Sequence, residues 1–104
     1  MNELLFAYGT LKEADVQKYV FGRILDGMAD TLQGFVISER RMYGRYLVLE
    51  KGSDTSAAIQ GMCFALSKSE LLKADIYEGP AYKRVALSLK SGAVAWVYIE
   101  KDGS

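Results

Sequence analysis

The stretch from Leu4 to Leu11 reads Leu-Leu-Phe-Ala-Tyr-Gly-Thr-Leu, and the rest of the chain is best understood from it. Its first five residues form an apolar, aromatic-rich run, which is typical of a strand that is buried on both faces. Gly9 and Thr10 then interrupt the run sharply. The sequence therefore predicts a buried strand that ends at this pair, inside the core.

The bend after this strand could bind an anion. Gly9 can take a positive φ or let another backbone come close, Thr10 offers a hydroxyl, and the amides that follow lack regular partners. Successive free N–H groups hold a carboxylate or a phosphate through fixed dipoles. From the residues alone, an ordinary strand-ending turn is the favoured interpretation, and recognition of one end of a small substrate is the alternative.

The composition predicts one compact domain over residues 1–104. Thirteen basic and thirteen acidic residues cancel, and the pI is near 6.2, so nucleic acid is not expected as a partner. No apolar run approaches the roughly 20 residues that span a bilayer, and no signal segment begins the chain, so no membrane association is expected. The single cysteine, Cys63, indicates a reducing cytoplasm.

Histidine is absent from the sequence, and this excludes several kinds of chemistry. Neither a Ser-His nor a Cys-His nucleophile can form, and no histidine-containing metal site is available. Any reaction must use carboxylates, tyrosines, lysines, arginines or the backbone. We therefore expect no metal and no cofactor.

A surface helix is predicted from Ala14 to about Ile24, with an early end at Gly22 as an alternative. Its apolar residues recur at spacings of three and four and are expected to form the buried stripe: Val16, Tyr19, Val20 and Ile24. Strand signals then run from Met28 to Glu50. Their interruption at Gly34 is read as a bulge or a close backbone approach.

Between these strand signals lies the basic cluster Glu39–Arg45, for which a solvated turn is favoured over a substrate clamp. A polar turn follows at Lys51–Ser56. Ala57–Leu66 is predicted to be another strand, and Cys63 within it is read as a small buried hydrophobe and not as a reactive thiol.

Ser67 and Glu70 have the spacing of a capping box, so a helix is predicted to begin there. Leu72 and Ile76 are expected to share its buried face, with Leu71 beside them. Gly79 and Pro80 are expected to end it.

Two final strands, at residues 82–90 and 93–101, are predicted to pair through a two-residue turn at Ser91-Gly92. This register sets Leu89 opposite Val94, Leu87 opposite Trp96 and Val85 opposite Tyr98. Both faces of the hairpin are largely apolar, so both must be covered. The simplest arrangement is a curved or closed small barrel with a helix against its outer surface.

Glu78 is poorly placed for stability, because the C-terminal pole of a helix disfavours a carboxylate. Asp75 lies one turn earlier and adds to the problem, and Tyr77, Pro80 and Tyr82 could shield the group from water. A raised pKa is therefore expected, which would suit the carboxyl to take and return a proton. A plain surface glutamate is the favoured alternative on these grounds alone.

Four motifs in order along nearly the whole chain resemble the gamma-glutamylcyclotransferase-like family, which includes gamma-glutamylamine cyclotransferases. They are Leu5-Phe-Ala-Tyr-Gly-Thr-Leu11, Asp75-Ile-Tyr-Glu-Gly79, Tyr82-Lys-Arg84 and Ala95-Trp-Val-Tyr98. The resemblance implies an α+β fold, a small mixed β-barrel of about five to seven strands with flanking helices.

For the site, the resemblance implies that Tyr8, Gly9, Thr10 and Leu11 form the substrate-binding loop and that Glu78 is the acid/base. Tyr82 matches the family tyrosine after this glutamate and is placed in the pocket wall. The implied reaction releases 5-oxoproline and a free amine from a small gamma-glutamyl compound. The chain departs from the family at Tyr43–Leu47 and at Gly61-Met62, and the leaving amine is undefined. A non-catalytic small-molecule binding module on the same barrel is the alternative.

Overall fold

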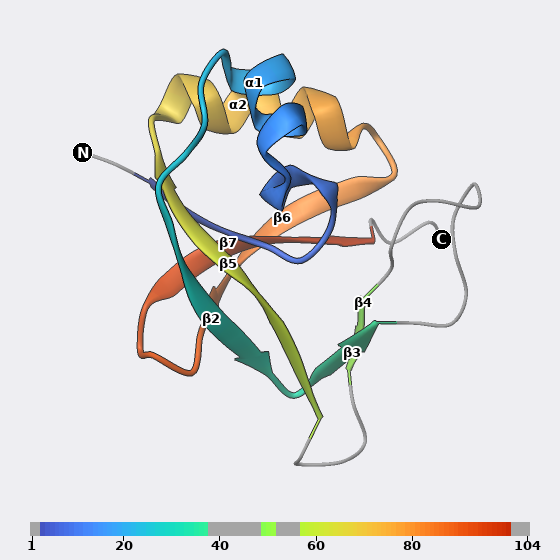
Figure 1. The fold of residues 1–104 in the computed structure, drawn as a ribbon. Helices are drawn as coiled ribbons and strands as arrows, with labels where there is room; N and C mark the ends of the chain where they lie inside the picture. The colour runs from blue at the N-terminus through green and yellow to red at the C-terminus, as the bar shows by residue number, and fades with distance from the viewer. Residues whose placement is uncertain (1–2, 38–48, 52–56, 101–104) are drawn as a thin grey trace.

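The structure is a computed structural model that describes residues 3–37, 49–51 and 57–100 (Figure 1). In chain order the elements are β1 (Glu3–Ala7), the short 3-10 helix η1 (Thr10–Lys12), α1 (Ala14–Phe21), β2 (Gly27–Gln33), β3 (Phe35–Ile37), β4 (Leu49–Lys51), β5 (Ala58–Leu66), α2 (Lys68–Glu78), β6 (Tyr82–Ser88) and β7 (Val94–Glu100). Residues 38–48 and 52–56 lie outside the described residues. They include the predicted basic cluster Glu39–Arg45, the predicted strand signals at 46–48 and most of the predicted polar turn Lys51–Ser56.

The main sheet has five strands in the order β2-β5-β1-β7-β6, so the first strand of the chain lies at its centre. β1 is antiparallel to β5 and parallel to β7. β3 and β4 form a separate antiparallel ribbon. The predicted mixed α+β fold with flanking helices is confirmed.

The sheet is curved and, among the described strands, open: β2 and β6 are its two edges. The loop after β6 reaches back to β2, where the Lys90 amide donates to the Thr31 carbonyl at 2.8 Å. The Ser91 hydroxyl and the Asp30 carboxylate form a second contact between the same two segments. The described strands therefore do not close into the expected barrel. Hydrogen bonds from a loop, and not a pairing of strands, connect the two edges of the sheet.

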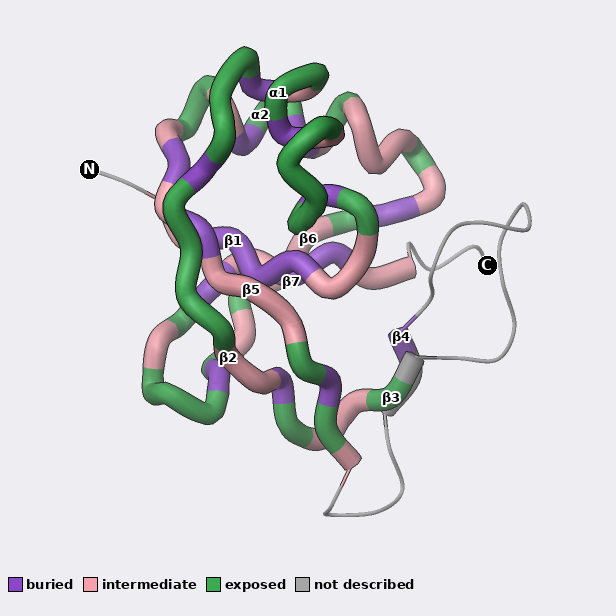
Figure 2. The backbone as a smooth tube through the Cα atoms, viewed as in Figure 1, coloured by how far each residue is buried: buried purple, intermediate pink, exposed green. Residues whose placement is uncertain are grey.

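Two apolar clusters cover the two faces of β1. Leu5 and Ala7 pack with residues from both helices, including Phe21 and Ala74. Phe6, which points the other way, packs with residues of β2, β4, β5 and β7. Figure 2 shows buried residues along β1 and β7, whereas the outer surfaces of the helices are exposed. The prediction that β1 is buried on both faces is confirmed.

Both helices begin and end as the local sequence predicts. The capping box of α2 is present, since the Ser67 hydroxyl accepts from the Glu70 amide and the Glu70 carboxylate accepts from the Ser67 amide. α1 ends early, at Gly22, whose φ of 77° is in the left-handed region. No helix in the described part of the chain is long and apolar enough to cross a membrane.

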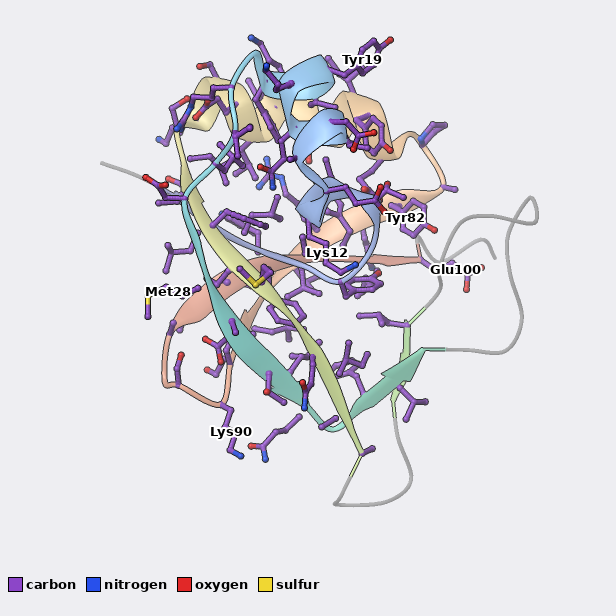
Figure 3. The ribbon with its side chains drawn as sticks, viewed as in Figure 1. Lys12, Tyr19, Met28, Tyr82, Lys90 and Glu100 are labelled. Atoms are coloured by element: carbon purple, nitrogen blue, oxygen red, sulfur yellow. The ribbon has the colours of Figure 1, made fainter. Side chains whose placement is uncertain are left out.

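The predicted apolar faces of the helices are right only in part: Val16 and Val20 of α1 are half-buried against the core and Leu71 of α2 is buried, but the other predicted residues are exposed. Tyr19 is 86% exposed and Ile76 is 81% exposed, and Figure 3 shows Tyr19 pointing away from the protein. Ile24 and Leu72 are also exposed. The buried positions are Gln17 and Phe21 in α1 and Leu71 and Ala74 in α2.

Gln17 is buried because its side chain replaces missing backbone partners: it donates to the Leu11 carbonyl and accepts from the Leu25 amide, both at 2.9 Å. This polar anchor sets the rotation of α1. In α2 the small side chain of Ala74 allows the helix to approach its neighbours closely, so the face that contains Leu71 and Ala74 is turned inward.

Of the two alternatives predicted for Gly34, a bulge or a close backbone approach, the close approach is wrong. Gly34 has a φ of 86° and open space where a Cβ would lie, so it serves as a turn between β2 and β3. The close approach occurs at Gly61 in β5, where a Cβ would lie 2.5 Å from the Ala7 carbonyl oxygen. Cys63, predicted to be buried, is only half-buried.

The hairpin register also differs from the prediction. The Leu89 amide donates to the Ala93 carbonyl at 2.7 Å, so the loop contains three residues, Lys90–Gly92, with Gly92 at a φ of 97°. The one-residue change moves each pairing: Trp96 lies opposite Ala86, and Tyr98 lies opposite Arg84. Trp96, Tyr98 and Arg84 therefore share one face of the sheet.

Candidate active site

Glu78 lies at the end of α2 on its inward face. Leu71, Ala74 and Glu78 are spaced at i, i+3 and i+7, so the face that buries the first two also turns the carboxyl toward the sheet. Burial raises the pKa of Glu78 to about 7. The raised pKa agrees with the prediction, but its cause is burial, because the charge of Asp75 is neutralised by an ion pair with Arg84.

The loop after β1 contains Tyr8, Gly9, Thr10 and Leu11. Gly9 has a φ of −117°, so the positive φ considered from the sequence is not used. The backbone hydrogen bonds of the turn begin with the Lys12 amide, which donates to the Gly9 carbonyl at 3.3 Å. Among the described residues, the amides of Gly9, Thr10 and Leu11 have no hydrogen-bond partner, while the buried Leu11 side chain fixes the loop to the core.

Two hydrogen bonds join this loop to distant parts of the chain. The Tyr8 hydroxyl donates to the Tyr98 main-chain carbonyl at 2.6 Å. The Thr10 hydroxyl lies 2.7 Å from the hydroxyl of Tyr77, the residue before Glu78. The loop and the end of α2 are therefore neighbours.

Electrostatic coupling places the carboxyl near the same tyrosines. The pKa of Tyr8 is raised, first by burial and then by the charges of Glu78 and Tyr82. The pKa of Tyr98 is also raised, by burial, by its hydrogen bond to Asp75 and by the charge of Glu78. The structure thus brings the sequence-predicted residues Tyr8, Tyr82 and Glu78 together, with Gly9, Thr10 and Leu11 in the adjoining loop.

A pocket of about 410 Å³ opens next to Tyr82; neither Glu78 nor the loop Tyr8–Leu11 lines it. It is lined by Asp75, Tyr82, Lys83, Arg84, Trp96 and Tyr98. Figure 3 labels Tyr82, which lies where the chain leaves α2 and enters β6. Aromatic rings form much of the wall, and an ion pair forms its polar side.

Asp75 and Arg84 are the centre of this polar side. Arg84 donates two hydrogen bonds to the Asp75 carboxylate, at 2.8 and 3.0 Å, and the Tyr98 hydroxyl donates a third at 2.6 Å. The guanidinium lies over the Trp96 ring at 4.7 Å, and the Trp96 indole donates to the Glu3 carboxylate at 2.9 Å. Sequence reasoning assigned no site role to Asp75, Arg84, Trp96 or Tyr98. The correct hairpin register would have placed Arg84, Trp96 and Tyr98 on one face of the sheet, because it pairs Arg84 with Tyr98 and Ala86 with Trp96, but it gives no signal for Asp75.

The described residues contain no group of three or more acidic or cysteine side chains arranged to hold a metal ion. A carboxyl with a pKa near neutrality exchanges protons readily at physiological pH, and amides without partners can bind an anion or an oxyanion.

Fold and site together define a small α+β protein with a partly buried carboxyl at the end of a helix whose last turn is hydrogen-bonded to the loop that follows a central strand. The chain belongs to the gamma-glutamyl cyclotransferase, AIG2-like family, whose model matches residues 5–103. No curated protein matches the chain in sequence.

Several solved structures share the fold. The chain is similar to the protein At3g28950.1 from Arabidopsis thaliana, with a TM-score of 0.82 and 23% identity over 96% of this chain and 62% of that one. The chain is also similar to At5g39720.1 from the same plant, with a TM-score of 0.79 and 22% identity over 99% of this chain and 71% of that one. A structure named gamma-glutamyl cyclotransferase has a TM-score of 0.71 and 16% identity, over 97% of this chain and 68% of that one. The chain thus spans about three fifths of the length of At3g28950.1.

Proposed function

We propose that this protein is a cofactor-independent cyclotransferase that acts on a small gamma-glutamyl amine or peptide and releases 5-oxoproline and the free amine. The reactants need no metal and no protein nucleophile. In such a compound the α-amine attacks its own side-chain carbonyl, the new C–N bond closes a five-membered lactam, and the bond to the leaving amine breaks. The single cysteine fits a cytoplasmic protein.

Glu78 is the proposed acid/base. Its ionised form removes a proton from the substrate ammonium, which makes the amine nucleophilic, and its protonated form returns that proton to the departing amine. The regenerated carboxylate then takes the second proton, which the ring nitrogen loses on closure, and passes it to the released amine. A pKa of about 7 suits both halves of this cycle, because each form is well populated near neutral pH. This carboxyl, partly buried and coupled to the tyrosines of the site, is the observation that carries the proposal.

The strand-end loop is the proposed substrate anchor. The amides of Gly9, Thr10 and Leu11 would bind the α-carboxylate of the substrate or the oxyanion that develops at its carbonyl. Tyr8 and Tyr82 would form the wall that folds the substrate into its reactive shape. Orientation of an intramolecular attack is worth roughly 7 to 11 kcal/mol, so positioning supplies much of the expected acceleration.

The test is incubation of the purified protein with a panel of gamma-glutamyl amines and gamma-glutamyl amino acids, with 5-oxoproline measured by mass spectrometry. We expect turnover of at least one compound and a loss of roughly 100-fold or more in Glu78→Gln, which keeps the shape of the side chain. Near-native turnover in this variant would remove Glu78 from the mechanism. Binding of the compounds without any product would identify a non-catalytic binding module.

A further inference from the structure

α2 forms a bidentate ion pair near each end, through Glu70 and Asp75. The helix sequence accounts for the acidic residue at the first position but not for the one at the second. Glu70 belongs to the capping box and accepts two hydrogen bonds from Arg23, at 2.7 and 2.9 Å. Asp75 lies in the last part of the helix, where a negative charge is unfavourable and where the helix itself has no basic residue. The arginine that neutralises it comes from β6.

Asp75 stabilises the last turn of α2, which carries Glu78, through its main-chain carbonyl and through its carboxylate. Its main-chain carbonyl accepts the Gly79 amide at 3.0 Å, which closes the backbone around Glu78. Its carboxylate accepts from Arg84 on β6 and from Tyr98 on β7. The end of the helix is thereby tied to two strands.

Arg84 is itself held in a fixed orientation. Its guanidinium lies over the Trp96 ring, and the indole of Trp96 is held by Glu3 of β1. The side chains of Arg84 and Asp75 are 23% and 35% exposed, and those of Arg23 and Glu70 are 50% and 14% exposed, so water screens the two pairs to a similar extent. A planar, two-pronged contact of this kind fixes geometry as well as charge.

We propose that Asp75 and Arg84 form a positioning pair that holds the last turn of α2 against β6 and β7 and keeps the Glu78 carboxyl inside the site. This inference deepens the proposed function and rests on it for its catalytic meaning. Neither residue needs to touch the substrate. Their role is to keep Glu78 aimed at the strand-end loop and shielded from water.

The groups that face Glu78 come from four elements or their ends. The charge of Glu78 raises the pKa of Tyr8, which follows β1, and of Tyr98 in β7; Tyr82, at the start of β6, acts on the pKa of Tyr8, and Asp75 and Arg84 form their ion pair one turn before Glu78. Two effects of losing Arg84 therefore have opposite signs. Exposure of Glu78 to water lowers its pKa, whereas the uncompensated charge of Asp75 raises it.

The experiment measures the carboxyl titration of Glu78 by NMR on protein labelled with carbon-13 in its glutamate carboxyl groups, with Glu78→Gln identifying the signal. In Arg84→Met we expect the Glu78 pKa to fall from about 7 toward its ordinary value of 4.5, because burial is what raises it and the loss of burial outweighs the added charge of Asp75. Arg84→Lys keeps the positive charge but loses the bidentate hydrogen bonding, so a smaller fall of the Glu78 pKa is expected. This variant replaces Arg84→Met if Arg84→Met does not fold. An unchanged or raised pKa in both variants would overturn the proposal.

Arg23→Met is the matched control, since it removes a guanidinium paired with a carboxylate of the same helix and should leave the Glu78 titration unchanged. A shift in this control equal to that in Arg84→Met would also overturn the proposal. On a compound that the native protein cleaves, kcat should fall on the order of 10-fold to 100-fold in Arg84→Met, with KM little changed. If the native protein cleaves nothing, the proposed function fails, but the titration still decides whether Arg84 positions the carboxyl.

Discussion

The hydroxyl of Tyr8 donates to the main-chain carbonyl of Tyr98 at 2.6 Å, across 90 positions of the sequence. Tyr98 in turn donates its own hydroxyl to Asp75. One residue of β7 is thus joined both to the strand-end loop and to the helix that carries Glu78. This chain of hydrogen bonds is the structural basis for treating the two segments as one site.

Replacing Tyr8 with Phe should lower the free energy of unfolding by about 1 to 2 kcal/mol, because it leaves the Tyr98 carbonyl without its part-buried donor. Urea denaturation followed by circular dichroism measures the change. Tyr77→Phe is the control, since it removes a hydroxyl from an exposed hydrogen bond and should cost less than about 0.5 kcal/mol. Equal losses in the two variants would contradict the prediction.

The raised pKa of Glu78 makes stability depend on pH. A carboxyl whose folded pKa is about 7 and whose ordinary pKa is 4.5 favours the folded state most when protonated, below the lower value. Its contribution is lost as pH rises from about 4.5 to 7, by on the order of 2 kcal/mol, less than the full shift implies because the side chain is only partly buried. Chemical denaturation across this range, compared between the native protein and Glu78→Gln, measures the difference.

In that comparison Glu78→Gln should gain stability relative to the native protein as pH rises. Above about pH 7 the difference should level off, because the native carboxyl is then ionised in both states. A constant difference across the whole range would mean that Glu78 titrates normally.

Thr10→Val should weaken substrate binding with little effect on the chemical step. The substitution keeps the branched shape but removes the hydroxyl that meets Tyr77, so the loop loses its attachment to α2. Loss of one such hydrogen bond predicts an increase in KM of roughly 2-fold to 10-fold in steady-state assays of 5-oxoproline release. Thr10→Ser keeps the hydroxyl and should remain close to the native value, whereas an equal effect of both substitutions would exclude the hydrogen bond as the cause.

Gly61→Ala should destabilise the fold by about 2 kcal/mol or more, because the added methyl group would lie 2.5 Å from the Ala7 carbonyl oxygen and 2.8 Å from the Phe6 ring. Thermal unfolding measures the loss. Gly22→Ala offers a comparison in which there is open space but a positive φ, and about 1 kcal/mol is expected. Gly22→Asn should recover part of that loss, whereas Gly61→Asn should recover none.

Features that depend on neighbours in the sequence were predictable. The capping box at Ser67, the end of α1 at Gly22 and the buried strand before Gly9 each follow from residues within one turn or one strand. The raised pKa of Glu78 was predicted from its place on the helix, although burial by distant residues is what produces it.

Features that depend on contacts between distant segments were not predictable. The hairpin register follows from a choice between two-residue and three-residue loops that Ser91 and Gly92 do not decide on their own. The inward face of α1 is set by Gln17, a polar residue whose partners are the backbone of two other segments. For the same reason the pairing of Asp75 with Arg84 could not be read from their spacing.

The central position of β1 has a consequence for how the protein is made. β1 leaves the ribosome first, but its parallel neighbour β7 is the last strand of the sheet to emerge. Until residues 94–100 have been synthesised, one edge of β1 lacks its neighbour and Tyr8 lacks its carbonyl acceptor. The site therefore forms only after translation has passed β7, and a nascent chain that stops before β7 should have no functional centre.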